Sequence, residues 1–100
     1  MQTDELDIRF EEAGNRGKYS ILMPNGQESK LTFVRIGPDH VVADHTYVPP
    51  PYRNQGVAER MVERFVADLR TAGTKVTPTC WFVRDEFTRH SPDWDDLLKR

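Results

Sequence analysis

Alternation of apolar and polar residues predicts four β-strands in the first half of the chain. In the first three runs, apolar side chains recur at every second position, the spacing that places them on one face of a strand. The fourth run is richer in β-branched residues, which favour extended backbone. The expected strands cover residues 6–12, 19–23, 31–36 and 40–48. Because the connections are short, we expect an antiparallel meander.

The apolar period changes after the three prolines at 49–51. Apolar residues then recur at three- and four-residue steps on one face of a predicted helix, which Gly73 ends as a left-handed cap. This stripe consists of Ala58, Met61, Val62, Phe65, Leu69 and Ala72. Residues 75–83 are again extended in pattern and predict a fifth strand. A strand–helix–strand order requires a crossover, so the fifth strand should lie parallel to the fourth.

Short helical segments are expected over 84–90 and in a last turn that contains Trp94. The predicted fold class is therefore α+β, a mixed sheet with an antiparallel four-strand meander and a parallel fifth strand. The exposed edges of such a short sheet are compatible with a monomer or a homodimer.

Length and charge narrow the classes of protein. One hundred residues, of which 37% are hydrophobic, predict one domain over 1–100. A net charge of −2 argues against a nucleic-acid binder or a protein that binds anionic membranes. Uncharged stretches are too short to cross a bilayer and the first residues are acidic, so we expect a cytoplasmic protein. The three histidines and the single cysteine lie far apart in sequence, and no metal site is predicted.

The turn at 53–58 is the strongest candidate for a binding site. It follows a strand and a proline run, and it opens the amphipathic helix. Backbone N–H groups at a helix start suit an anion, especially the phosphates of a nucleotide-like ligand. The alternative is an ordinary strand-to-helix turn with a solvated arginine, and the motif by itself leaves both interpretations open.

The pattern Arg53-x-x-Gly56-x-Ala58 after a strand resembles the acetyl-CoA pyrophosphate motif of the GCN5-related N-acetyltransferase (GNAT) superfamily. Together with the runs at 45–48 and 78–83, it resembles more closely the very small GCN5-like proteins that carry a conspicuous cysteine. This resemblance extends over nearly the whole chain. The two helices that larger relatives insert between strands one and two have no room here, which implies an unusually open acceptor side.

The resemblance implies acetyl-CoA as co-substrate and a V-shaped opening where strands four and five splay apart. Pantetheine would lie in the V against the backbone of strand four, and the pyrophosphate would lie on the amides of the following turn. The implied cofactor-binding residues are Tyr47, Val48, Arg53, Asn54, Gln55, Gly56, Val57 and Ala58.

Cys80 and His45 are the candidate catalytic residues. Many larger relatives carry a tyrosine after strand five that protonates the leaving sulfur, whereas the last tyrosine here is Tyr52. A cysteine thiolate can accept an acetyl group or act as an acid, and histidine titrates in the range of a general base. The alternatives are a buried, inert cysteine and a histidine that is only hydrogen-bonded in the sheet.

Three functions follow from these observations. The first is an N-acetyltransferase-like protein that transfers acetyl from acetyl-CoA to an unidentified amine, either a small molecule or a peptide, directly or through Cys80. The second is a CoA-binding sensor or interaction module with little or no catalysis. The third is a small interaction domain without a cofactor.

Overall fold

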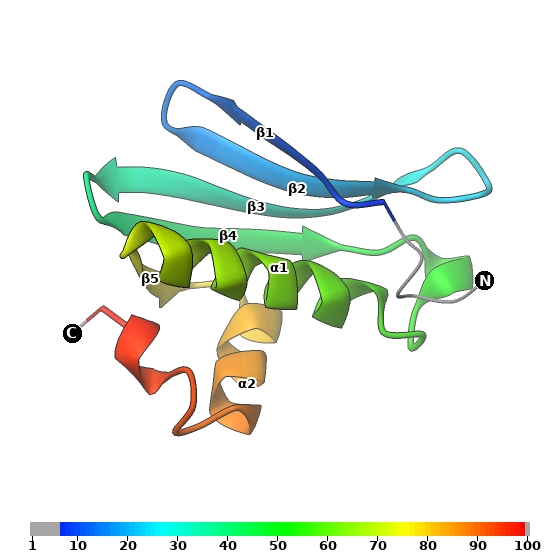
Figure 1. The fold of residues 1–100 in the computed structure, drawn as a ribbon. Coiled ribbons are helices and arrows are strands. Elements are labelled where there is room, and N and C mark those ends of the chain that lie inside the picture. Colours follow the sequence, from blue (N-terminus) through cyan, green and yellow to red (C-terminus); the bar gives the residue numbers. More distant parts are fainter. Residues whose placement is uncertain (1–6, 100) are drawn as a thin grey trace.

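Five strands form one mixed sheet in the spatial order β1-β2-β3-β4-β5 (Figure 1). The computed structural model describes residues 7–99. β1 to β4 pair antiparallel, and β5 pairs parallel with β4. The strands are β1 (Arg9–Ala13), β2 (Arg16–Leu22), β3 (Glu28–Gly37), β4 (His40–Tyr47) and β5 (Lys75–Pro78). This arrangement confirms the predicted α+β class, with its meander and parallel fifth strand.

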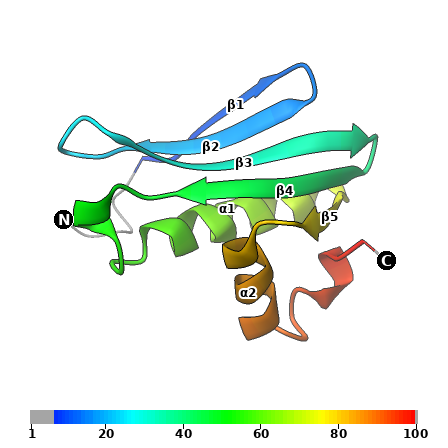
Figure 2. The same ribbon diagram turned by 180° about the vertical axis from the view of Figure 1, so that it is seen from behind.

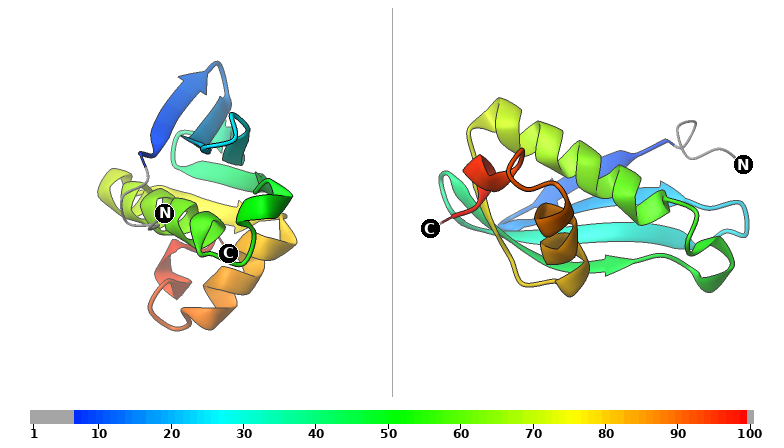
Figure 3. Two further views of the ribbon diagram at one scale, coloured as in Figure 1. Left: turned by 90° about the vertical axis from the view of Figure 1, so that its right-hand side faces the viewer. Right: turned by 90° about the horizontal axis from the view of Figure 1, so that it is seen from below.

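Two helices complete the fold, α1 (Val57–Ala72) and α2 (Trp81–Arg89). A short 3₁₀ turn (Pro50–Tyr52) precedes α1, and a second one (Asp95–Leu97) follows α2. α1 lies along one face of the sheet, whereas α2 lies beyond β5 at the edge (Figure 3). Seen from behind, the other face of the sheet carries no helix of the described chain (Figure 2). Within residues 7–99, no helix combines the length and apolar character needed to cross a bilayer.

The core lies between α1 and the facing side of the sheet. Most residues of the predicted apolar stripe on α1 are buried in this core, and Gly73 caps the helix with φ 68°. Ala72 is an exception, because it is exposed at the last turn. The buried side chains between the two layers include Tyr19, Ile21, Leu31, Phe33, Val41, Met61, Val62, Phe65 and Leu69.

The first strand differs from its prediction. The expected strand at 6–12 is observed as Arg9–Ala13, and Leu6 lies outside the described residues. The prediction of a buried face is wrong for β1, whose five residues are all exposed; Phe10 is 43% exposed and lies against the Phe33 ring, 6.2 Å between centroids. The reason is that β1 is an edge strand, and α1 packs instead on β2 and β3.

The predicted fifth strand at 75–83 is wrong in its second half. β5 ends at Pro78, and α2 begins at Trp81, so Cys80 is the N-cap of a helix and not a strand residue. Aromatic and β-branched residues at 81–83 favour a strand locally. The helix prevails because it buries Val83 and Phe87, four residues apart, on one face.

β4 and β5 part halfway along β4. Their pairing ends at Ala43 and Pro78, and the amides of Thr79 and Cys80 both donate to the Ala43 carbonyl, at 2.9 and 3.0 Å. Where β4 pairs with β3, Ala43 and the residue after Asp44 each have a partner on β3, but Asp44 between them has none. This extra residue marks a β-bulge in β4. The rest of β4 therefore runs without β5 beside it, and this confirms the splayed fifth strand.

We predict that Gly17→Ala destabilises the fold by about 1–3 kcal/mol, because a methyl group there would overlap the buried ring of Phe33. Chemical denaturation measures the change. Gly37→Ala is the matched control, since its methyl group would meet only the His40 Cβ at 3.8 Å. It should stay within about 0.5 kcal/mol of the native chain. Equal stability of the two variants would show that the Phe33 contact does not limit this position.

Candidate functional site

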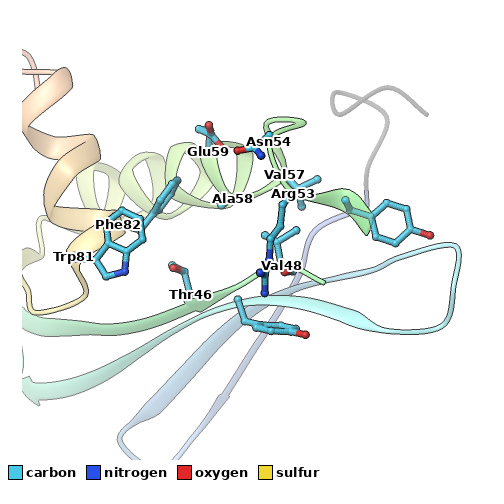
Figure 4. A pocket seen from close by; sticks show the side chains of 11 residues that line it. Thr46, Val48, Arg53, Asn54, Val57, Ala58, Glu59, Trp81 and Phe82 are labelled. Atoms are coloured by element: carbon cyan, nitrogen blue, oxygen red, sulfur yellow. Dashed lines mark hydrogen bonds between the residues drawn. The ribbon is translucent and has the colours of Figure 1, made fainter. Parts of the chain in front are cut away.

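A cavity of about 350 Å³ opens where β4 and β5 part, between the end of β4 and the starts of α1 and α2 (Figure 4). β4 and the residue after it form its floor, the 53–58 turn and the first turn of α1 form one end, and the first residues of α2 form the other. The lining residues are Thr46, Tyr47, Val48, Tyr52, Arg53, Asn54, Val57, Ala58, Glu59, Trp81 and Phe82.

The floor of the cavity is an extended backbone segment at an open sheet edge. Thr46, Tyr47 and Val48 follow the point at which β5 turns away, so β5 does not pair with them. An open edge offers N–H and C=O groups to an extended ligand, which can add to the sheet like another strand. In the structure, Arg53 Nε donates to the Val48 carbonyl at 2.8 Å.

At one end of the cavity, the turn presents the start of α1. Asn54 and Gly56 both have positive φ, 63° and 82°, and Gly56 is the N-cap. The first helical hydrogen bond joins the Arg60 amide to the Gly56 carbonyl at 3.1 Å, and no side chain caps the helix. The amides that precede Arg60 in the helix therefore have no intrahelical acceptor, and with the helix dipole they favour an anion.

Hydrogen bonds hold this turn in place. The Arg53 amide donates to the Pro50 carbonyl at 3.3 Å, and Gln55 Nε2 donates to the Pro51 carbonyl at 3.2 Å. From the β2–β3 connection, the Asn25 amide donates to the Tyr52 hydroxyl at 3.1 Å. A turn fixed in this way has lost much of its conformational entropy before a ligand binds.

The other end of the cavity is aromatic. Trp81 is 70% exposed although it is large and apolar, and its ring meets that of Phe82 edge to face, 5.9 Å between centroids. Figure 4 shows both side chains near Thr46, at the end away from the turn. Directly before Trp81, Cys80 is only 9% exposed, and its Sγ lies 3.5 Å from Thr46 Oγ1.

The structure brings most of the predicted cofactor-binding residues together. Six of the eight line the cavity, while Gln55 and Gly56 belong to the turn without lining it. Cys80 is not a lining residue but contacts one, Thr46. His45 is exposed and does not line the cavity. The catalytic roles of Cys80 and His45 stay predictions.

Several residues that line the cavity were not predicted as binding residues. Trp81 and Phe82 were expected on a strand and in the core rather than in an aromatic pocket, and Thr46 and Glu59 gave no local signal. Glu86, on α2, is buried. Its burial is the main reason that its pKa is raised, and the negative charge of Glu59 raises the pKa further. The i,i+4 spacing of apolar residues around Glu86 is the signal that would have predicted its burial.

Among residues 7–99, no three histidine, cysteine or acidic side chains lie together as metal ligands would.

Known proteins resemble the chain in sequence and in fold. Residues 18–97 match the family described as GCN5-related N-acetyl-transferase. Protein NATD1 of Danio rerio is 29% identical over 97 residues, 91% of this chain and 86% of that protein, and Protein NATD1 of Mus musculus is 26% identical over 87 residues, 85% and 77%. A solution structure of a GCN5-like protein from Staphylococcus aureus has a similar fold, with a TM-score of 0.69, 20% identity, and coverage of 91% of this chain and 87% of that one.

Proposed function

The chain belongs to the GCN5-related N-acetyltransferase family, and we propose that its cavity binds acetyl-CoA and that the protein transfers the acetyl group to an amine. One observation carries the proposal. The turn that presents the free amides of α1 and the open edge of β4 line the same cavity. An anionic group and an extended, amide-containing chain can therefore be bound side by side, and CoA has both.

Different residues along the cavity would bind different parts of acetyl-CoA. The diphosphate would lie on the amides of Gln55 to Ala58, with Arg53 and Asn54 beside it. The pantetheine amides would pair with the backbone of Tyr47 and Val48. The thioester would then lie toward Thr46, at the aromatic end. A thioester supplies an activated acetyl group, so the protein has mainly to orient it and to exclude water.

The acceptor would approach from the open side of the aromatic end. In the direct route, the amine nitrogen attacks the thioester carbonyl carbon, the carbon–sulfur bond breaks and the CoA thiolate leaves. A base must take the proton from the nitrogen and an acid must supply one to the thiolate. We propose Cys80 and His45 for proton transfer, and a cytoplasmic setting in which the lone cysteine stays reduced.

Cys80 can also act covalently. Its thiolate would attack the thioester carbonyl, so that a bond from Sγ to the acetyl carbon forms as the bond to the CoA sulfur breaks. The amine would then attack this acetyl group and return Cys80 to the thiolate. The Thr46 hydroxyl, 3.5 Å from Sγ, supports either role because it can donate a hydrogen bond to a thiolate.

A second candidate function is binding of acetyl-CoA without turnover, as a sensor or interaction module. Two observations favour it. Cys80 is only 9% exposed and does not line the cavity, which leaves its Sγ little access to a bound thioester. The chain also has no tyrosine after Tyr52, so the acid typical of larger relatives is missing.

We predict that Gly56→Ala weakens acetyl-CoA binding about tenfold or more, measured by calorimetry, because the side chain strains the left-handed N-cap that presents the amides. Gly73→Ala is the matched control, since Gly73 caps the other end of α1 with φ 68°. It should cost the fold about as much, roughly 1 kcal/mol, and leave the affinity unchanged. Equal affinities for the two variants would contradict the proposed phosphate site.

We predict that Cys80→Ala lowers kcat by roughly a hundredfold with an amine that is turned over, while acetyl-CoA affinity stays constant. Cys80→Ser, which keeps the hydrogen bond to Thr46 but loses the thiol, should be impaired as well. Intact-mass spectrometry without acceptor separates the routes, because an acetyl adduct on Cys80 requires the covalent one. Unchanged kcat in both variants would reduce Cys80 to a packing role.

A further inference from the structure

We propose that Arg53 is a displaceable latch that makes the cavity selective for acyl donors carrying a diphosphate. The inference rests on the proposed function and adds a rule of donor specificity to it.

The Arg53 side chain reaches from the turn to the end of β4 (Figure 4). Its Nε donates to the Val48 carbonyl at 2.8 Å, and its guanidinium carbon lies 5.7 Å from the centroid of the Tyr47 ring. Within residues 7–99, Arg53 forms no ion pair with a carboxylate, in contrast to the neighbouring Arg60, which pairs with Glu63 at 3.1 Å. The Arg53 charge is therefore held only by a neutral carbonyl and an aromatic face.

These contacts use the groups that a bound pantetheine chain needs. Val48 and Tyr47 form the open edge against which an extended ligand would pair, and Arg53 already occupies the Val48 carbonyl. A ligand that pairs with this edge therefore competes with the guanidinium for the Val48 carbonyl, and full pairing along the edge displaces Arg53. Leaving costs one hydrogen bond and one cation–π contact, and a ligand has to compensate for this loss.

A diphosphate provides that compensation. A guanidinium binds phosphate oxygens through charge-assisted, bidentate hydrogen bonds, which are stronger than a bond to a neutral carbonyl. Phosphate on the adjacent turn would draw Arg53 away from Val48 and uncover the edge for pantetheine. An acyl donor without phosphate offers no hydrogen bonds that replace those that Arg53 loses when it leaves Val48. The site should therefore bind CoA thioesters more tightly than simple pantetheine thioesters.

The test uses S-acetylpantetheine, which lacks phosphate, together with inorganic diphosphate, and measures binding by calorimetry. In the native chain, saturating diphosphate should tighten S-acetylpantetheine binding by about tenfold, the value of the two latch contacts. Arg53→Ala should bind S-acetylpantetheine about tenfold more tightly than the native chain without diphosphate, and should gain nothing more when it is added. The same variant should bind acetyl-CoA more weakly.

Arg60→Ala is the control, because it removes an equal charge in the first turn of α1, seven residues further along the chain, from a residue that does not line the cavity. It should keep the native coupling between the two ligands. Arg53 is exposed, so the variant should fold, and thermal melting checks this. The latch is overturned if Arg53→Ala binds S-acetylpantetheine no better than the native chain, or if diphosphate still improves binding in that variant. Failure of acetyl-CoA to bind the native chain would instead overturn the proposed function itself.

Discussion

The parting of β4 from β5 is the constraint on which the site depends. Pro78 has no N–H to donate, and the Ala43 carbonyl takes both of the amides that follow, so the ladder between the strands cannot continue. The bulge at Asp44 bends β4 at the same level. Thr32 Oγ1 donates to Asp44 Oδ1 at 2.6 Å, which anchors the bulged residue to β3.

The cavity is a direct consequence of that parting. Past Ala43, β5 no longer pairs with the edge of β4, and the chain leaving β5 turns into α2, which forms the aromatic wall. The same turn places Cys80 against Thr46, two residues that are 34 positions apart in sequence. At the opposite end, the helix that fills the core on one side offers its N-terminus to the cavity. The shape of the cavity and the packing of the core therefore depend on the same few elements.

The sequence carries some of these features locally and others only through long-range contacts. The α1 stripe and the glycine turn are local, since a helix period and a positive-φ glycine act over a few residues, and both were predicted. The β4–β5 pairing followed from the crossover rule. The start of α2 could not be predicted locally, because Trp81 and Phe82 suit either structure and only the burial of Val83 and Phe87 decides. The exposed edge position of β1 likewise depends on how far α1 reaches.

An NMR titration of the ¹⁵N-labelled chain with acetyl-CoA would show directly whether the ligand binds in the cavity beside β4. We expect the amide resonances of residues 54–58 and 46–48 to shift together and to saturate at one equivalent of ligand. A second groove of about 350 Å³, which includes Phe10, Phe33 and Phe65, lies between the first strands and α1. If the shifts instead cluster in that groove while the resonances of the turn amides do not move, acetyl-CoA does not bind in the cavity beside β4.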